Sequence, residues 1–508
     1  MVSNTLSKKA LDATKWSSLT EFIAKLIVPV TNIILARVLT PNAFGVVASV
    51  TLIISFADMI SDSGFQKFLI QKEFSSPEKK IKFINVAFWS NFILSLVLWS
   101  VLCVYRNIFA DILGNSNLGT IIVIAGASLP LTSFSSIQIA VFRRSFDYKT
   151  LFKIRVIEVF SSFVVTVPLA LLGFKHWSII YGILFRDLVK AVLLTMKSSW
   201  KPKLYYSIVI LKEMLTFSLW SLIESLTIWL TSYVGTFILA NTLSDYYLGL
   251  YKTTIITVNG IFSIITLSTT SILFTALSRV QNDEVQFKSY YYNFINYTSM
   301  IILPLGIGTY VYRDFITEIL LGSQWKEAST FLGIWALMSC ITIILGQYCS
   351  EIYRSKGMPK ISVLVQVFHL IALIPTLLIF SKHDFSTLIY ARSLIKAQQI
   401  LVNLIAIYYL FNFSPFRILN IIYPYIKCSI LMGIVGHYLR ALKMGYLWEI
   451  ISILLCMLLY LVLLISNSKS RRSVFQVCKS FNWLHKKLEK NHYYKNINSE
   501  NKCDSTVS

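Results

Sequence analysis

The sequence predicts an all-α integral membrane protein with about fourteen transmembrane helices. About twelve of them would form two parallel-repeat six-helix lobes around a central cavity, followed by a C-terminal helix pair. Three features predict this fold class. Apolar runs recur along almost the whole chain, basic residues gather in alternate loops, and a motif of the first helix returns near the middle of the chain.

The apolar content is too high for a water-soluble protein. Of the 508 residues, 55% are hydrophobic and only 14% are charged, and a soluble core cannot enclose that much apolar surface. Runs such as Ile84 to Tyr105 and Ile450 to Ile465 are each about long enough to cross a hydrocarbon layer of ~30 Å. The chain therefore needs lipid around it.

The apolar runs mark the expected spans, with boundaries good to a few residues. In chain order these spans are Ser17 to Leu39, Ala43 to Ile60, Ile84 to Tyr105, Leu118 to Val141, Val156 to Phe174, Trp177 to Met196, Leu215 to Leu243, Tyr247 to Leu273, Tyr292 to Tyr312, Phe331 to Ile352, Ile361 to Phe380, Leu388 to Phe411, Ile418 to Leu439 and Tyr446 to Ile465. We expect the basic tail after Ile465 to be a solvated cytoplasmic segment attracted to anionic lipid headgroups.

The positive charges predict the orientation. The formal net charge is +23, but in a membrane protein the placement of Lys and Arg is more informative than their number. The basic loops hold Lys8, Lys9 and Lys15; Lys67, Lys72, Lys79, Lys80 and Lys82; Arg143, Arg144, Lys149 and Lys153; Lys197, Lys201, Lys203 and Lys212; and Arg354, Lys356 and Lys360. The alternate loops, around Thr40, Asp111, Lys175, Asp245 and Lys382, are nearly bare of positive charge. Both termini should therefore lie on the cytoplasmic side of a bacterial cell membrane, which requires an even number of spans. We expect no nucleic-acid partner, because the positive charge is explained by the membrane topology.

The cysteines predict neither a metal site nor a disulfide framework. The seven cysteines are scattered, with Cys103, Cys340 and Cys456 inside apolar runs, and no pair has metal-ligand spacing. We therefore expect no metal and no cofactor. The polar start before Trp16 lacks the cleavage site of a signal peptide, so the first helix should be retained.

A motif of the first helix recurs near the seventh at one constant displacement without gaps. Trp16, Ser17, Val30, Ile34, Leu35, Ala36, Leu39 and Gly45 return as Trp220, Ser221, Val234, Ile238, Leu239, Ala240, Leu243 and Gly249. Because six expected spans precede the second copy, the halves are parallel repeats; chance similarity between apolar helices is the alternative. The expected parts are a cytoplasmic N-terminus (1–16), an N-lobe (17–212), a C-lobe (213–411), two further helices (412–467) and the tail (468–508).

Short motifs follow one another along the chain as far as about Ile361. They are Ile34 to Gly45, Asp62 to Gln71, Arg143 to Tyr148, Trp200 to Pro202, Leu273 to Arg279, Leu321 to Trp325 and Lys356 to Ile361. Their order and spacing resemble the oligosaccharide (Wzx-type) flippases of the polysaccharide transport family, in the MOP superfamily with the lipid II flippase MurJ and the MATE drug exporters. The resemblance implies two lobes around a lumen and transport by alternating access. The chain departs from it at Thr275, where proline is usual, and at Gly235, where many relatives carry aspartate.

Cations inside the expected spans are the candidate substrate-binding residues. They are Lys25, Arg37, Arg186, Lys190, Lys252, Arg392 and Lys396. A charge at the bilayer centre costs at least ~2.5 to 3.5 kcal/mol, so such residues need a wet cavity or a partner. Arg392 and Lys396 share a helix face with Gln399 and Asn403 and are too deep for easy snorkelling, which favours the lumen. Arg37 and Lys252 lie nearer the ends of their helices, where snorkelling is the commoner explanation.

The cations of the first and sixth helices have carboxylates nearby. Lys25 lies one turn from Glu21, with Pro29 removing the hydrogen bond to its carbonyl, so this pair is either a lumen site at a flexible point or a structural ion pair. In the sixth helix Asp187 can neutralise at best one of Arg186 and Lys190.

Acidic residues are candidates for coupling transport to a proton or sodium gradient. They are Glu21, Glu224 and Asp58, the last on a face of the second helix with Thr51, Ser55 and Asp62. Asp62 is equally well explained as a helix-end residue before Gly64, and Glu158 as the partner of Arg155.

These charges suit an undecaprenyl-diphosphate-linked oligosaccharide that crosses to the outer face for capsule, O-antigen or exopolysaccharide synthesis. Arg and Lys can replace part of the hydration that the diphosphate loses, polar and aromatic side chains can hold the sugars, and the polyprenyl tail can stay in lipid. We expect membrane lipids and other polysaccharide assembly proteins as further partners.

Two other classes of membrane protein agree less well with the sequence. A membrane polysaccharide polymerase or ligase needs a catalytic surface outside the bilayer, but the external loops are short and the six histidines dispersed; no enzymatic activity is expected. A multidrug exporter of the same fold should offer cationic drugs an acidic pocket, whereas the mid-membrane charges here are mostly basic.

The charge pattern predicts the topology directly. Reporters fused after Lys82, Lys153, Lys203 or Lys487 should report cytoplasm, and those after Asp111 or Lys382 the outside, because positive residues stay on the cytoplasmic side. Paired reporters with opposite compartment requirements make the measurement. An external C-terminal tail would contradict the arrangement of about fourteen spans.

Overall fold

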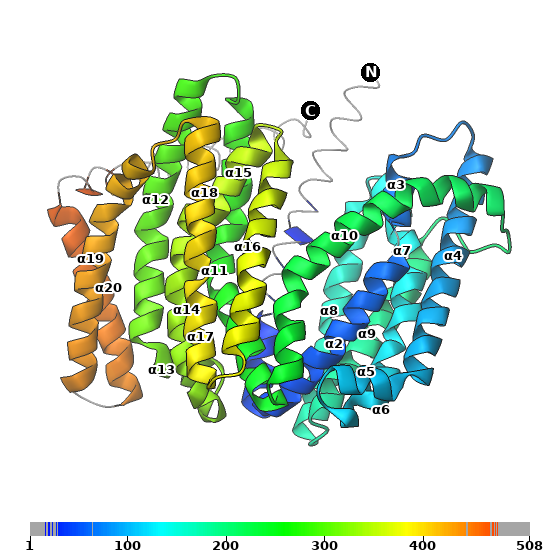
Figure 1. Cartoon of the computed structure of the whole chain (residues 1–508), viewed down its shortest axis with the longest axis horizontal. Coiled ribbons are helices and arrows are strands. Elements are labelled where there is room, and N and C mark those ends of the chain that lie inside the picture. Colours follow the sequence, from blue (N-terminus) through cyan, green and yellow to red (C-terminus); the bar gives the residue numbers. More distant parts are fainter. Residues whose placement is uncertain are drawn as a thin grey trace, which may run out of the picture. The chain divides into compact units, whose positions relative to one another are not determined.

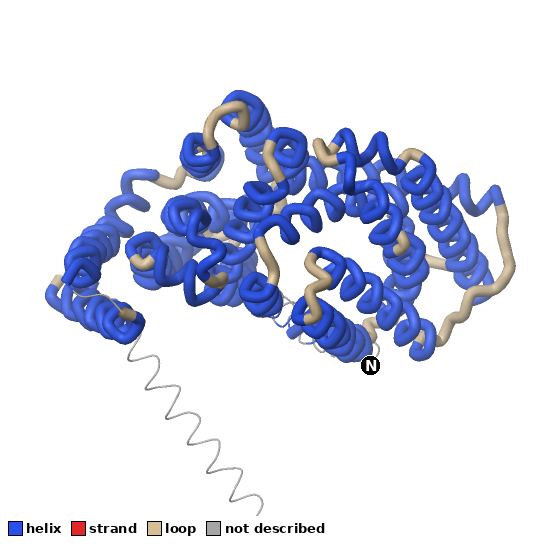
Figure 2. The backbone as a smooth tube through the Cα atoms, turned by 90° about the horizontal axis from the view of Figure 1, so that it is seen from below, coloured by secondary structure: helices blue, strands red, loops and turns tan. Residues whose placement is uncertain are grey.

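The computed structural model describes residues 29–62, 64–442, 445–467 and 470–471, with isolated positions on either side. Residues 1–15 of the expected N-terminal segment and most of the basic tail (468–508) lie outside the described residues. Within the described residues the chain consists of helices and short connections and contains no strand (Figures 1 and 2). The all-α class predicted from the sequence is confirmed.

The helices follow the apolar runs closely. They are α2 (Pro41–Asp62), α3 (Phe65–Gln71), α4 (Pro77–Val104), α5 (Arg106–Ile112), η1 (Ser116–Leu118), α6 (Gly119–Gly126), α7 (Ser128–Arg144), α8 (Tyr148–Leu171), α9 (His176–Lys197), α10 (Ile208–Thr242), α11 (Asp245–Arg279), α12 (Glu284–Val311), α13 (Arg313–Leu320), η2 (Ser323–Ala328), α14 (Ser329–Thr342), the π-helical η3 (Ile343–Gln347), α15 (Tyr348–Ser355), α16 (Pro359–Phe380), α17 (Phe385–Leu394), α18 (Lys396–Phe411), α19 (Pro415–Leu442) and α20 (Tyr446–Ser466).

Eleven helical stretches of the described residues are long and apolar enough to cross a membrane. They coincide with the expected second to fifth and eighth to fourteenth spans. The expected sixth and seventh spans coincide with α9 and α10, of which α9 carries three charged residues in its middle. The helix Pro29–Val38 is the described part of the expected first span.

Two expected spans are interrupted. The fourth breaks at Ala127 because Pro130, in the first turn of α7, cannot donate a hydrogen bond to the carbonyl of Gly126. The twelfth breaks at Ile395, between α17 and α18. Arg392 and Lys396, expected on one continuous helix, therefore stand on either side of a helix junction.

The chain divides into two compact units. Unit 1 comprises Met1–Ser268, Arg313–Thr342 and Met358–Val402, and unit 2 comprises Thr269–Tyr312, Ile343–Gly357 and Asn403–Ser508. In unit 1, α9 packs along α8 and α7, and α7 along α4. In unit 2, α12 and α20 both pack against α19, where Gly436 lies close to the Cys456 thiol and Tyr312.

Unit 1 contains a reciprocal contact between the repeats, at the N-terminal ends of α2 and α11. A Cβ added to Gly45 would overlap the carbonyl oxygen of Asp245, and a Cβ added to Gly249 would overlap that of Pro41. Pro41 and Asp245 are separated by the same displacement as Gly45 and Gly249, so each half of the contact is the repeat image of the other. Such reciprocity is the pattern that a two-fold relation between the repeats produces. We call these four residues the crossing.

Side chains of the motif Leu321 to Trp325 hold the end of the first helix close to the crossing. Gln324 Nε2 donates to the carbonyls of Ala36 and Leu39 at 2.6 and 2.8 Å, and Trp325 Nε1 donates to Ala36 at 2.7 Å. The Arg37 guanidinium donates to the carbonyl of Ile319 at the end of α13. Carbonyls at helix ends have no partner within the helix, so these donors satisfy them.

Arg144, from the motif Arg143 to Tyr148, caps the C-terminal end of α3. The Arg144 guanidinium donates to the carbonyls of Leu69 and Lys72, each at 2.6 Å, and stacks over Phe74 with 4.8 Å between Cζ and the ring centroid. It thus satisfies the C-terminal carbonyls of α3. This bonding gives the arginine a structural role.

The crossing predicts a steric sensitivity at its glycines. Gly45→Ala and Gly249→Ala should each lower the thermal stability of the purified protein, because a methyl group must push two backbones apart, at a cost of about 1–3 kcal/mol. Gly308→Ala is the matched control, since a Cβ there meets no atom within 4 Å. Equal melting temperatures for Gly45→Ala and Gly308→Ala, measured by size-exclusion after heating, would show that the contact is looser than described.

Candidate functional site

Some of the candidate residues fall outside the structural description. Glu21 and Lys25 lie outside the described residues. The backbone of Asp62 and Glu224 lies in α2 and α10, but their side chains lie outside the description as well. Five of the other candidates, Asp58, Arg186, Lys190, Arg392 and Lys396, lie at two separate polar sites, both within unit 1.

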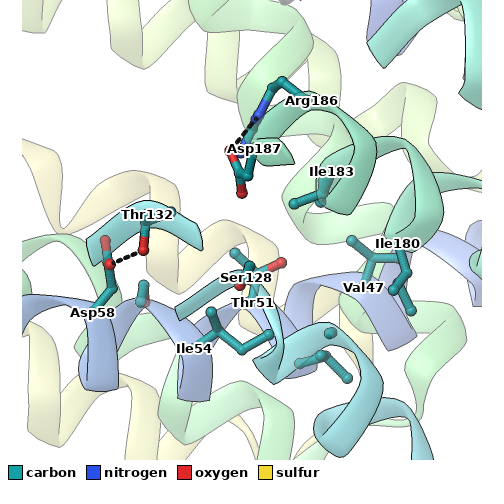
Figure 3. Close-up of a pocket in the computed structure, with 13 residues that line it drawn as sticks. Val47, Thr51, Ile54, Asp58, Ser128, Thr132, Ile180, Ile183, Arg186 and Asp187 are labelled. Atoms are coloured by element: carbon teal, nitrogen blue, oxygen red, sulfur yellow. Dashed lines mark hydrogen bonds and ion pairs between the residues drawn. The ribbon is translucent and has the colours of Figure 1, made fainter. Parts of the chain in front are cut away.

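The first site is a small cavity enclosed by α2, α6, α7 and α9 (Figure 3). Its volume is about 230 Å³, and its lining consists of Val47, Val50, Thr51, Ile54, Ser55, Asp58, Ala125, Ser128, Thr132, Ile180, Ile183, Arg186 and Asp187. One liquid water molecule takes up about 30 Å³. The cavity is therefore large enough for several water molecules or a small ion.

Asp58 enters this cavity from α2. Its carboxylate accepts a hydrogen bond from the Thr132 hydroxyl at 2.7 Å, as Figure 3 shows. Thr51 and Ser55, predicted on the same helix face, line the cavity with it. The face inferred from the sequence is thus a polar surface, opposite Arg186 and Asp187.

A charged network continues from the cavity into the space between α8 and α9. Glu158 is 3% exposed and accepts from Arg155 at 2.8 Å, with the Arg186 Nε at 3.8 Å. Asp187 is 1% exposed and pairs with Arg186 at 3.0 Å and Lys190 at 3.5 Å. The expected pairing of Glu158 with Arg155 is confirmed. Three cations share two carboxylates, so opposite charges nearly balance here.

The second site surrounds the indole of Trp335 on α14. Lys396 Nζ lies 3.2 Å and Arg392 Cζ 4.8 Å from the ring centroid, so both cations face one aromatic ring. Lys396 is buried and donates to Ser339 at 2.9 Å, while Arg392 Nε donates to the Tyr251 hydroxyl at 3.0 Å.

No carboxylate of the described residues lies within ion-pair distance of either cation in this second site. The residue at position 235, on α10, bears on this imbalance because it lies beside the site. A Cβ on Gly235 would lie 3.8 Å from the Tyr251 hydroxyl, which is the partner of Arg392. An acidic side chain at this position would therefore reach the cation pair, and glycine leaves it uncompensated.

The remaining cations have local partners. Lys252 Nζ donates to the Thr236 hydroxyl at 2.9 Å and lies 5.5 Å from the Tyr233 ring centroid. Arg37 bonds to backbone carbonyls of α13, as described above. The structure thus brings Arg392 and Lys396 together and, separately, Arg186 and Lys190, whereas Lys252 and Arg37 join neither site.

Sequence reasoning did not identify Trp335, Tyr251 and Ser339. A signal was present, because Phe331, Trp335 and Ser339 recur every fourth residue and so share one face of a helix. These three residues contact side chains of α11, α17 and α18. Such contacts between distant helices cannot be read from the sequence of the tenth span alone.

Residues 34–330, more than half of the chain, match the family described as "Polysaccharide biosynthesis protein". The chain belongs to this family. Among curated relatives, the lipopolysaccharide biosynthesis protein WzxC of Escherichia coli (strain K12) is 22% identical over 381 residues, covering 74% of this chain and 75% of the relative. An uncharacterized membrane protein in the cps region of Klebsiella pneumoniae is 22% identical over 378 residues, covering 73% and 76%.

Solved structures share the fold. The lipid II flippase MurJ, in an inward closed conformation, superposes with a TM-score of 0.73 at 14% identity, covering 88% of this chain and 97% of that one. An inward-facing MATE multidrug resistance transporter of the MOP superfamily gives a TM-score of 0.57 at 15% identity, covering 78% and 94%. The chain therefore shares the helical fold of these two proteins.

The charged network predicts that its buried carboxylates stabilise the protein. Glu158→Gln should lower the melting temperature, because the two arginines beside it lose a charged acceptor, at a cost of about 1–3 kcal/mol. Glu284→Gln is the matched control, since Glu284 is 73% exposed and pairs only across 3.7 Å with Lys288. A Glu158→Gln protein as stable as the Glu284→Gln control would assign the network no structural role.

Proposed function

We propose that this chain is a flippase that moves an undecaprenyl-diphosphate-linked oligosaccharide from the cytoplasmic to the outer face of the membrane. The observation that carries the proposal is the pair of the buried Lys396 and the half-buried Arg392, which lies within the expected twelfth span and has no carboxylate partner among the described residues. The names of WzxC and of the succinoglycan biosynthesis transport protein ExoT, a relative from Rhizobium meliloti (strain 1021), support it.

Electrostatics favours an anionic substrate for the second site. Two unneutralised cations away from water are costly, and an anion that brings its own charge removes that cost. A diphosphate offers several oxygens to the planar guanidinium and to the ammonium at once. The Arg392–Lys396 pair thus provides the preorganised donors that a polyprenyl diphosphate needs inside a low-dielectric layer.

The rest of the substrate has different requirements. Sugars are uncharged and can be held by hydroxyl, amide and aromatic side chains, while the polyprenyl tail can remain in lipid. A site that is open to one side at a time would let the diphosphate enter from the cytoplasm and leave outside. In this mechanism the two repeats, which contact each other at the crossing, would move relative to one another.

The cavity beside Asp58 suits the coupling step. Its carboxylate and the hydroxyls of Thr51, Ser55, Ser128 and Thr132 are the oxygen donors that a sodium ion or a proton would use. The Arg186–Asp187 pair on the opposite wall would sense the change in charge at Asp58. Ion uptake at this site would then be separate from substrate binding at Trp335.

The proposal includes the orientation of the chain in the membrane and its class as a transporter. The alternating basic loops favour cytoplasmic termini in a bacterial cell membrane, with the substrate delivered and used by other polysaccharide assembly proteins. A transporter with no enzymatic step fits relatives named for transport and biosynthesis. The alternative of a drug exporter of the same fold is disfavoured, because a cationic drug would be repelled by Arg392 and Lys396.

The proposal predicts a loss of export when the cations are removed. The double variant Arg392→Ala, Lys396→Ala should export little saccharide while it still reaches the membrane, and Arg392→Lys should lose part of the activity because the ammonium lacks the bidentate fork. Export of the saccharide and accumulation of its lipid-linked precursor on the cytoplasmic face make the measurement. Normal export by the double variant would contradict the proposal.

Gly235 offers a test without removing either cation. Gly235→Asp should block export, because the new carboxylate lies next to Tyr251 and competes with the diphosphate for Arg392. Gly235→Asn has almost the same shape without the charge and is the matched control. Equal export by the two variants would show that charge at this site does not matter.

A further inference from the structure

Two buried donors in the second site have no acceptor. Arg392 Nη1 and Trp335 Nε1 are both inaccessible to solvent, and neither has a hydrogen-bond partner among the described residues. They belong to side chains in direct contact, with 4.8 Å between Arg392 Cζ and the indole centroid. Buried N–H groups without an acceptor are costly and rare in native proteins, so two on side chains in contact suit acceptors supplied by a ligand.

The same indole also keeps the two cations together. Like charges repel, and the described residues place no carboxylate between Arg392 and Lys396. The electron-rich face of Trp335 attracts both, and the ring itself is held by the edge of Phe331, whose centroid is 5.5 Å away, and by burial to 4% exposure. Phe331 in turn stacks on Tyr251, the partner of Arg392. The ring is therefore fixed before any ligand arrives.

We propose that Trp335 is a further substrate-binding residue, whose ring face positions Arg392 and Lys396 and whose N–H donates to the diphosphate. The proposal rests on the proposed function and adds to it a specific contact. Each donor needs an acceptor oxygen, and the diphosphate portion of a polyprenyl-linked saccharide supplies several anionic oxygens close together, which bind the cationic guanidinium more strongly than neutral sugar hydroxyls do. Trp335 thereby contributes to selection of the diphosphate over an uncharged lipid.

Two substitutions separate the two contributions of Trp335. Trp335→Phe keeps an aromatic face but loses the N–H, whereas Trp335→Leu loses both. The control is Trp99→Phe, which removes an indole N–H that already has an acceptor, the carbonyl of Val123 at 2.9 Å. Full-length protein in nanodiscs is titrated with farnesyl diphosphate, farnesyl monophosphate and farnesol, and the melting temperature of each variant is recorded.

The expected result is a graded and selective loss of diphosphate binding. Trp335→Phe should bind farnesyl diphosphate about tenfold more weakly than the wild type, Trp335→Leu more weakly still, and Trp99→Phe normally, with farnesol unchanged throughout. Equal diphosphate affinity for Trp335→Phe, Trp335→Leu and Trp99→Phe would overturn the role of Trp335. Wild-type protein that does not prefer the diphosphate to farnesol would overturn the proposed function itself, whatever the variants do.

Discussion

The backbone contact between α2 and α11 is the constraint on which the arrangement of unit 1 depends. In lipid, apolar side chains gain little by leaving their surroundings, so helices associate where small residues let backbones approach. Gly45 and Gly249 provide this approach at equivalent places in the two repeats. The two helices that meet there carry Asp58 and Tyr251 into the two polar sites, so their contact helps to position both residues.

The two polar sites differ in charge balance more than in composition. Around Asp187 and Glu158, cations and carboxylates lie within 4 Å of one another and largely cancel. Around Trp335, two cations share an aromatic ring and two hydroxyl partners, which reduce repulsion without neutralising it. A network whose charges balance keeps its geometry when solvent or ions change. A site with excess positive charge is stabilised most when an anion binds.

The sequence predicted the helices well because lipid leaves the backbone little choice: each polar backbone group must be bonded within its own segment. The break at Ala127 was also foreseeable from Pro130, whereas nothing near Ile395 marks the second break. Arg392 and Lys396 stood out because deep cations are expensive. The pairing of Glu158 with Arg186, by contrast, joins α8 and α9, and contacts between helices leave no periodic trace in one sequence.

The hydrogen bonds from Gln324 and Trp325 to Ala36 have a consequence for biosynthesis. Gln324 and Trp325 are 288 and 289 residues away from Ala36 in the sequence. The hydrogen bonds to the carbonyl end of the first helix can therefore form only after more than half of the chain has been synthesised. Contacts this distant in sequence form late and leave earlier segments exposed to wrong pairing. During synthesis, the first helix therefore precedes the side chains of Gln324 and Trp325, and its terminal carbonyls lack these two donors until residues 324–325 have been added.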